Sequence, residues 1–270
     1  LYIDFQNNGS VRSIAVDPIR ISLKVSTPFS VSGANLWLRK RTDRIEYTAL
    51  LGPVSNSRFT IEGNTYVAAG NWAGLVYTCA LHLSGKSRSW LWSVEIENTS
   101  DGAVEADIIC VQDVGLKPVD SGLINDYYVS QYLERRILED KNYGSVVCCR
   151  QNMKESIGHP WFMMACKNMA TAASVDGMQF YGRTYRETGI PEGLMAETLG
   201  GEYSGESSAA ALQEKLFKLP AGGKHTSVFV ATYMADHPEA TSENDLERLP
   251  DLFSEFGNSE LHAGSHDMTA

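Results

Sequence analysis

Apolar and polar residues alternate with a period of two along most of the chain, as in β-strands that bury one face. In residues 18–25 (PIRISLKV) the odd positions are aliphatic, while positions 20, 22 and 24 are polar. Residues 74–83 (GLVYTCALHL) carry a second alternating run. We expect further strands at 144–150, 161–167, 177–181 and in the pair 216–219 and 225–233, which residues 220–223 (PAGG) join.

The clearest predicted hairpin spans residues 89–112 (SWLWSVEIENTSDGAVEADIICVQ). Its first arm places Trp90, Trp92 and other apolar residues on one face, and its second arm alternates again from Val104. Between the arms, NTSDG offers side chains that bond to the backbone and residues that tolerate positive φ. Both arms are near ten residues, which is long for strands and indicates broad sheets.

Helical periodicity is scarce before residue 241. There, Thr241 or Ser242 can cap a helix with an acidic first turn, and Pro250 breaks or restarts it. Residues 257–270 have no apolar pattern and are expected to be a linker. We therefore expect an all-β antiparallel sandwich or barrel at residues 1–240 and a helix with linker at 241–270, because strand–helix alternation is lacking.

Composition and charge narrow the class of protein. The 270 residues contain 43% hydrophobic and 21% charged residues, which fits a folded protein. A formal charge of −10 argues against a nucleic-acid partner. The basic cluster of Arg39, Lys40, Arg41 and Arg44 is interpreted as a solvated loop or strand end, and Glu95, Glu97, Glu105 and Asp107 as a solubilising face.

The five cysteines do not form a disulfide framework, because their number is odd and Cys148 and Cys149 are adjacent. Cys79 and Cys110 lie in apolar runs and are expected to be buried, so the cytoplasm is the expected compartment. No apolar run approaches the length of a membrane helix. A chain that begins without Met, directly in a strand pattern, is expected to be a piece of a longer protein.

Motifs for catalysis are sparse. Residues 80–87 (ALHLSGKS) resemble a phosphate-binding loop, but Ala80 replaces its first glycine and a strand pattern follows, so Lys86 is assigned to a hairpin. The six histidines form no spaced pair on one predicted face, so we expect no metal site. Asp113, at the end of a predicted strand, is a weaker candidate for ligand contact.

Residues 124–132 (INDYYVSQY) combine three tyrosines with amide side chains. As a strand, this segment would have no purely apolar face. Tyrosines bury ring area and keep a polar hydroxyl, which suits a sugar-binding wall or a domain interface, and the interface is favoured. Residues 150–152 (RQN) and 159–161 (HPW) offer further groups of the same kind.

Several of these segments resemble the amino-terminal region of the β-1,2-oligoglucan (sophorose-type) phosphorylases, relatives of cellobiose and chitobiose phosphorylases in glycoside hydrolase family 94. The resemblance runs from residue 1 to about 250. It rests on LYIDFQNNGSVRSI, ANLWLRKR, LLGP, WAGLVYTCAL, VEIENTSDGAVEADIICVQDVGL, NDYYVSQY, ILED, SVVCCRQN, HPWF and ADHPEATSENDL.

The resemblance implies a large antiparallel β-supersandwich of the galactose-mutarotase-like kind, followed in the family by a helical linker and an (α/α)₆ barrel with the catalytic acid. Inorganic phosphate would be the co-substrate, no other cofactor is implied, and the glycosidic bond would break with inversion to give α-glucose 1-phosphate. This sequence stops before any barrel, so no catalytic residue can be assigned to it.

The resemblance also implies partners: the chain's own barrel domain, a second subunit in a homodimer, and β-1,2-glucooligosaccharides. The expected residues at the rim of the substrate groove are Asn125, Tyr128, Gln131, Tyr132, Arg150 and Gln151. A scaffold domain of a related β-glucosyltransferase is an alternative to the phosphorylase. Two further hypotheses also stay open. One is a stand-alone carbohydrate-binding module, and the other is a sandwich enzyme such as a sugar epimerase, using His82 or His225 with a carboxylate.

Overall fold

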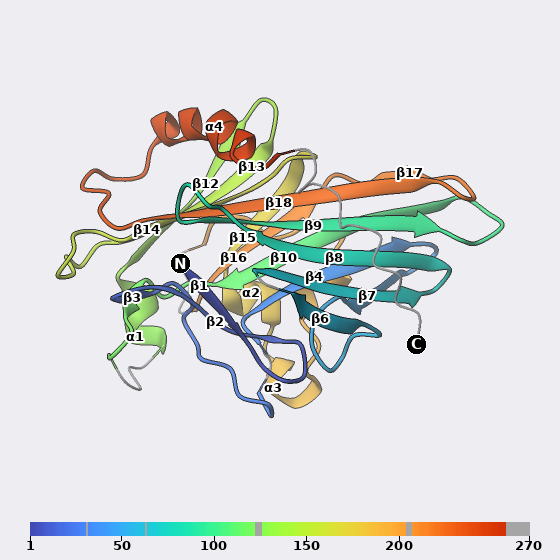
Figure 1. Cartoon of the computed structure of the whole chain (residues 1–270), viewed down its shortest axis with the longest axis horizontal. Helices are drawn as coiled ribbons and strands as arrows, with labels where there is room; N and C mark the ends of the chain where they lie inside the picture. The colour runs from blue at the N-terminus through green and yellow to red at the C-terminus, as the bar shows by residue number, and fades with distance from the viewer. Residues whose placement is uncertain (31, 63, 122–125, 204–206, 258–270) are drawn as a thin grey trace.

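The computed structural model describes residues 1–30, 32–62, 64–121, 126–203 and 207–257 of the chain. Within these residues, fourteen strands form one sheet and four short strands form another (Figure 1). The predicted all-β class and its antiparallel supersandwich architecture are confirmed. None of the helices in the described part of the chain is both long and apolar enough to cross a membrane.

The strands of the small sheet are β1 (Tyr2–Phe5), β2 (Val11–Val16), β3 (Ile19–Arg20) and β11 (Lys117–Pro118). Those of the large sheet are β4 (Ala34–Arg41), β5 (Ile45–Ala49), β6 (Arg58–Glu62), β7 (Thr65–Trp72), β8 (Leu75–Leu83), β9 (Ser89–Asn98), β10 (Val104–Asp113), β12 (Leu133–Asp140), β13 (Gly144–Gln151), β14 (Trp161–Cys166), β15 (Ala170–Asp176), β16 (Ser208–Glu214), β17 (Phe217–Leu219) and β18 (Lys224–Met234). The helical segments are α1 (Asp126–Gln131), α2 (Gly177–Tyr181), α3 (Tyr185–Thr188), η1 (Glu192–Met195), η2 (Glu243–Arg248) and α4 (Leu249–Ser254), where η marks a 3₁₀ helix.

The large sheet folds back on itself into two layers around one core. Its strands follow the order β5-β4-β10-β16-β15-β13-β14-β18-β9-β8-β7-β6, with β12 paired to β13 and β17 to β10. We call the layer that contains β4, β10 and β16 the first half and the layer that contains β14, β18 and β9 the second half. Inward side chains of both halves meet in the core, among them Ile108 of β10, Trp92 of β9 and Phe229 of β18. Cys110 Sγ lies 3.9 Å from Met164 Sδ, which joins β10 of one half to β14 of the other.

The outer faces of the two layers carry the helical segments. On the second half, α4 covers Val146, Met163 and Val230 with Leu252 and Phe253, and these residues form a separate apolar cluster. On the first half, α2 and η1 cover β4, β10 and β16, as the cluster of Trp37, Ile109, Phe180, Leu194 and Ala211 shows. Because the core covers one face of β10 and α2 and η1 cover the other, β10 is buried at every position except Glu105.

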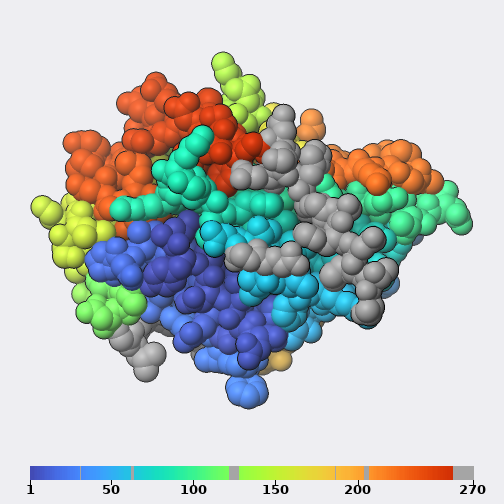
Figure 2. Space-filling model, in the orientation of Figure 1, coloured from blue at the N-terminus to red at the C-terminus, as the bar shows by residue number. Residues whose placement is uncertain are grey.

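The small sheet lies against the same core at one side. Val11 and Ile14 of β2 and Ile19 of β3 are buried in it. In Figure 2 the blue N-terminal residues cover the lower part of the view, below the red C-terminal helices. The predicted strand at 18–25 is thus largely wrong, because β3 ends at Arg20, although Ile21 and Leu23 are buried as the alternation implies.

The predicted hairpin at 89–112 is also wrong in its pairing. Both strands exist, but β9 lies between β8 and β18, and β10 lies between β4 on one side and β16 and β17 on the other. The turn therefore carries the chain from one half of the sheet to the other. Asn98 holds it in place, since its Nδ2 donates to the carbonyl oxygens of Gly102, Leu219 and Pro220 at 2.8–3.1 Å.

The other predicted strands are mostly confirmed. Strands β8, β13, β14, β17 and β18 appear where alternation predicts them, but β17 pairs with β10 and not with β18. Residues 177–181 form helix α2, because the Asp176 carboxylate accepts a hydrogen bond from Met178 N at 3.1 Å and caps a helical turn. Most of the segment 124–132 is likewise helical, as α1.

The C-terminal helix begins at the predicted N-cap, Ser242. Ser242 and Asp245 form a capping box, and α4 begins at Leu249 directly after η2, with Pro250 in its first turn. The helix thus restarts around the proline, as one of the two alternatives predicted. The division at residue 240 stays a prediction, and the expected linker beyond Gly257 lies outside the described residues.

The contact between β13 and β15 generates the first prediction. Gly144 pairs with Ala170 in a parallel register, and its φ is +69°. A Cβ at this position would overlap the carbonyl oxygen of Ala170. We expect Gly144→Ala to lower the free energy of unfolding by at least about 2 kcal/mol, because an L-residue is strained at this φ and the carbonyl must move.

Urea denaturation measures this effect, with Gly102→Ala as the matched control. A Cβ added to Gly102 would meet no atom within 4 Å, and the φ of Gly102 is not positive. That substitution should therefore change the free energy of unfolding by less than about 0.5 kcal/mol. Equal stability of the two variants would contradict the steric argument.

Candidate functional site

The predicted rim residues lie at one end of β12 and β13. Tyr132 precedes β12, and its carbonyl oxygen accepts a hydrogen bond from Asn152 N at 2.9 Å. Because Leu133 pairs with Gln151, the end of α1 lies beside the end of β13. The structure therefore brings Tyr132 and residues 150–152 together, although 18 or more positions separate them in sequence.

An exposed tyrosine and a half-buried one, Tyr128 and Tyr132, form the outer part of this group. Tyr128 on α1 is 49% exposed, and its ring meets that of Tyr132 edge-on at a centroid distance of 4.9 Å. A hydrogen bond with Tyr132 raises the pKa of the Tyr128 hydroxyl. Gln131 is exposed beside them, while Asn125 lies outside the described residues. An edge-on aromatic pair with a neighbouring amide offers both apolar and hydrogen-bonding surface.

Arg150 and Gln151, by contrast, are buried and engaged with the protein itself. The Arg150 guanidinium donates to the carbonyl oxygens of His237 and Pro238, each at 2.7 Å, and to Asn152 Oδ1 at 2.8 Å. Gln151 Oε1 accepts from Met153 N. The contacts of Arg150 fix the chain around residues 237–238 on the sheet, so its guanidinium has a structural role.

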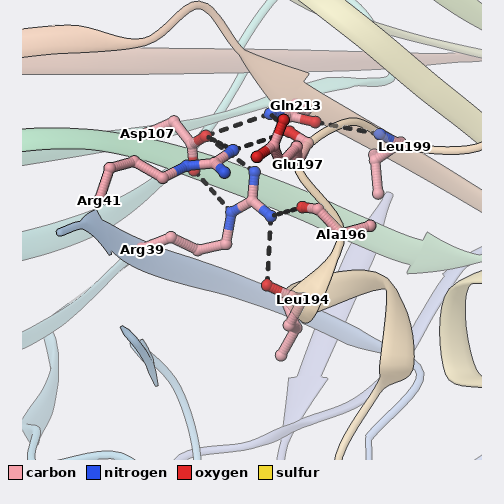
Figure 3. A network of polar contacts seen from close by, with 8 residues as sticks. All are labelled: Arg39, Arg41, Asp107, Leu194, Ala196, Glu197, Leu199 and Gln213. Atoms are coloured by element: carbon pink, nitrogen blue, oxygen red, sulfur yellow. Dashed lines mark hydrogen bonds and ion pairs between the residues drawn. The ribbon is translucent and has the colours of Figure 1, made fainter. Parts of the chain in front are cut away.

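A polar network in the interior surrounds Asp107 (Figure 3). Arg39 on β4 is directly opposite Asp107 on β10, both side chains are fully buried, and the guanidinium grips the carboxylate through two bonds of 2.7 and 2.8 Å. Arg41 Nη2 and Gln213 Nε2 donate to the same carboxylate at 2.9 and 3.1 Å. We predicted that the basic cluster and the acidic face are exposed to solvent. This prediction is wrong for Arg39 and Asp107, which are fully buried.

The same network holds the segment after η1 onto the sheet. Arg39 Nη1 donates to the carbonyl oxygens of Leu194 and Ala196, and Arg41 Nη2 donates to that of Glu197. Gln213 completes the attachment, since its Oε1 accepts from Leu199 N. In each of these bonds a side chain of the sheet contacts the backbone of residues 194–199. The network therefore holds this irregular segment in place over the outer face of the layer.

A second buried carboxylate, Glu214, is the one that the epimerase hypothesis requires. His225 Nε2 lies 2.9 Å from Glu214 Oε1, and Ser227 Oγ donates to Oε2 at 2.5 Å. Burial raises the pKa of Glu214, and the contacts with His225 and Ser227 oppose that rise. Both oxygens are thus already engaged, and the His225 ring stacks on Phe217 at 3.8 Å, which fits a satisfied interior pair. His82, the other candidate, is half-buried on β8.

Two other residues considered in the sequence analysis, Lys86 and Asp113, lie in parts of the chain that are held by hydrogen bonds within the protein. Lys86 lies in the turn of the β8–β9 hairpin, where Ser84 Oγ accepts from the backbone N–H of Lys86 and Ser87 at 3.1 Å, so its assignment to a hairpin is confirmed. Asp113 is 3% exposed, and its Oδ2 accepts from Lys24 N at 2.9 Å. This bond ties the end of β10 to the segment that follows the small sheet.

The cysteines are all free and buried. Burial raises the pKa of the Cys110 and Cys149 thiols to about 12, so both remain protonated and unreactive at neutral pH. Among the described residues, no group of three or more His, Cys, Asp or Glu side chains is placed to hold a metal ion.

The chain is similar to one protein family and to proteins of known structure or function. The profile of the SOGP N-terminal domain matches residues 4–231. The 1,2-beta-oligoglucan phosphorylase of Listeria innocua serovar 6a is 24% identical over 252 residues, which make up 93% of this chain and 22% of that protein. A solved polysaccharide lyase superposes with a TM-score of 0.53 at 8% identity, over 87% of this chain and 32% of the lyase, and shows the fold alone. The chain thus spans about a fifth of the length of the curated phosphorylase.

The Asp107 network generates the second prediction. Asp107→Asn removes the negative charge and leaves the guanidinium groups of Arg39 and Arg41 without their carboxylate, one of them fully buried. Loss of one partner from a buried ion pair leaves an uncompensated charge, so the free energy of unfolding should fall by about 3–5 kcal/mol. Chemical denaturation with circular dichroism measures it.

Glu105→Gln, on the same strand, is the matched control. Glu105 pairs with Lys218 at 3.6 Å, and the two side chains are 48% and 68% exposed. Water screens such a pair, so its loss should cost less than about 1 kcal/mol. A similar cost for both substitutions would show that the buried pair has no special weight.

Proposed function

We propose a function from one premise: the chain belongs to the SOGP N-terminal domain family. It is the amino-terminal β-supersandwich of an oligoglucan phosphorylase, and it supports a catalytic domain encoded elsewhere in the parent protein. The observation that carries this proposal is the match over 93% of the chain to a much longer phosphorylase, of which the matched part is only 22%.

The proposed role of this chain is non-catalytic. Two fully buried acids, Asp107 and Glu214, are both bound by neighbouring side chains of the sandwich. The general acid of the parent enzyme would lie in an (α/α)₆ barrel. There it would protonate the leaving oxygen of a β-1,2-glucan while inorganic phosphate attacks with inversion, releasing α-glucose 1-phosphate and a shortened glucan.

Two surfaces of the sandwich would serve the parent enzyme. Part of the exterior would form the contact with the barrel and with a second subunit in a homodimer. The exposed Tyr128 and Gln131, with the half-buried Tyr132, would border the substrate groove, and Arg150 and Gln151 would fix the strand ends behind them. An aromatic pair beside an amide suits the apolar C–H faces and hydroxyls of a glucan. Buried, protonated thiols support a cytoplasmic location.

A carbohydrate-binding module is the second candidate function, and the same tyrosine pair favours it. The two candidates differ in whether the chain binds glucan without its barrel. A parent that transfers glucosyl groups to acceptors other than phosphate would use the same scaffold.

Phosphorolysis by the chain alone tests the non-catalytic role. Incubated with sophorose-type oligomers and inorganic phosphate, these 270 residues should release no α-glucose 1-phosphate, while the Listeria innocua phosphorylase serves as the active control. Release of α-glucose 1-phosphate by the chain itself would refute the proposal. Coupled detection with phosphoglucomutase gives the readout.

Glucan binding tests the tyrosine rim. By titration calorimetry with β-1,2-glucooligosaccharides, Tyr128→Ala should weaken binding about five- to tenfold, because an aromatic contact of roughly 1 kcal/mol is lost. Tyr203→Ala is the matched control, since Tyr203 is 53% exposed and Tyr128 is 49% exposed. Equal affinities of the two variants would count against the rim, and no heat with the wild-type chain at millimolar ligand would count against the carbohydrate-binding module.

A further inference from the structure

A buried arginine of the small sheet has no anionic partner in the described part of the chain. Arg20, on β3, is 9% exposed. No acceptor bonds to its Nε there, and no carboxylate forms an ion pair with its guanidinium. A charge that is removed from water costs free energy unless an opposite charge or hydrogen-bond acceptors compensate it. The position of Arg20 is therefore unfavourable unless another group completes it.

Two other arginines, Arg39 and Arg150, are also buried, and acceptors within the chain bind both of them. Arg39 donates to Asp107 and to two backbone carbonyl oxygens. Arg150 donates to two backbone carbonyl oxygens and to Asn152. Nε of Arg20 is closed off from solvent without a partner, so a ligand would reach this guanidinium through its terminal nitrogens.

Arg20 belongs to a row of side chains on the outer face of the small sheet. It pairs with Lys117 of β11 on one side and with Ala15 of β2 on the other, and Ala15 pairs in turn with Tyr2 of β1. Directly paired residues of antiparallel strands project from the same face of a sheet. Ile19, which precedes Arg20, belongs to the core, so the row projects from the opposite face.

The row therefore places a second cationic side chain beside Arg20, because Lys117 is directly opposite it and is 4% exposed. A guanidinium can bind two oxygens of a phosphate at once, and a lysine ammonium adds a compact charge. A phosphate group carries about 1.5 to 2 negative charges at neutral pH. Two neighbouring cations match that charge better than the single charge of a carboxylate.

The carboxylates around the row have other partners. Asp17 accepts a hydrogen bond from the Tyr2 hydroxyl at 3.0 Å, and Asp4 accepts one from Ser13 Oγ at 3.3 Å. Asp4 and Asp17 are both exposed. Water and salt therefore screen their repulsion of an anion bound at Arg20.

We propose that Arg20, with Lys117 beside it, forms a binding site for a phosphate group on the outer face of the small sheet. The ligand is inorganic phosphate or the phosphate of a sugar phosphate such as α-glucose 1-phosphate. Its oxygens accept from the terminal guanidinium nitrogens and compensate the buried charge, so the ligand stabilises the folded chain. The site depends on the contacts of Arg20, and its failure would leave the proposed scaffold role untouched.

Thermal unfolding and titration calorimetry of the wild-type chain test the site, with inorganic phosphate and α-glucose 1-phosphate as probes. At a concentration about tenfold above Kd, a bound probe should raise the melting temperature by about 3–5 °C relative to chloride at equal ionic strength. The probe that binds more tightly identifies the source of the phosphate group. No rise above chloride with either probe, or an equal rise with acetate, would overturn the proposal.

Arg20→Met removes the charge and keeps an unbranched side chain. Its Kd for phosphate should rise about tenfold or more, because the charge-assisted hydrogen bonds are lost. Its melting temperature in chloride without phosphate should not fall, because the unpaired buried charge is also removed. Arg12→Met is the matched control, since Arg12 is an exposed arginine on β2 of the same sheet. This variant should keep the wild-type response to phosphate.

A phosphate response of Arg20→Met equal to that of the wild type would show that phosphate binds elsewhere and would contradict the site. If Arg20→Met fails to fold, NMR of the arginine side chains in the wild-type chain decides. Phosphate should shift the Nε–H signal of Arg20 and leave that of Arg12 in place. An Arg20 signal that does not move at saturating phosphate would also contradict the site.

Discussion

The buried pair of Arg39 and Asp107 is the interaction on which the first half of the sandwich depends. These residues face each other across β4 and β10, so the ion pair marks the register of the two strands at the same time as it joins them. A one-residue slip of either strand would separate the charges and turn every inward side chain outward. The cost of an unpaired buried charge therefore opposes such an error of strand pairing.

The same pair explains how an irregular segment can cover a sheet. Backbone carbonyl groups outside helices and strands need partners when they are buried. The carbonyl oxygens of Leu194, Ala196 and Glu197 obtain theirs from Arg39, Arg41 and Gln213. Because Asp107 holds these donors in position, the covering segment and the layer beneath it are stabilised together. The C-terminal segment achieves the same on the other layer, with η2 and α4 in place of an irregular chain.

Local pattern predicts local structure well in this protein and long-range structure poorly. Alternation identifies the strands around Tyr77 and Val147, and Ser242 identifies the helix start, because each signal lies within a few residues. The pairing of β9 and β10 is mispredicted since a good turn sequence such as 98–102 fits a crossing between layers as well as a hairpin. Arg39 and Asp107 are 68 positions apart, and only the register reveals that their charges meet in the interior. At Tyr128, a segment that as a strand would have no purely apolar face forms a short helix.

The distribution of polar groups bears on where ligand chemistry can take place. Asp107 is bound by two arginines and an amide, Glu214 by His225 and Ser227, and Asp245 by His237 and the backbone of Ser242. A carboxylate in such surroundings must break a protein contact before it can serve as an acid, a base or a ligand, and that loss opposes the reaction. The tyrosine pair beside β12 differs from these carboxylates, because about half of the Tyr128 side chain is exposed to solvent. This distribution of polar groups fits the proposed non-catalytic role, because the buried carboxylates are already bound by neighbouring protein groups.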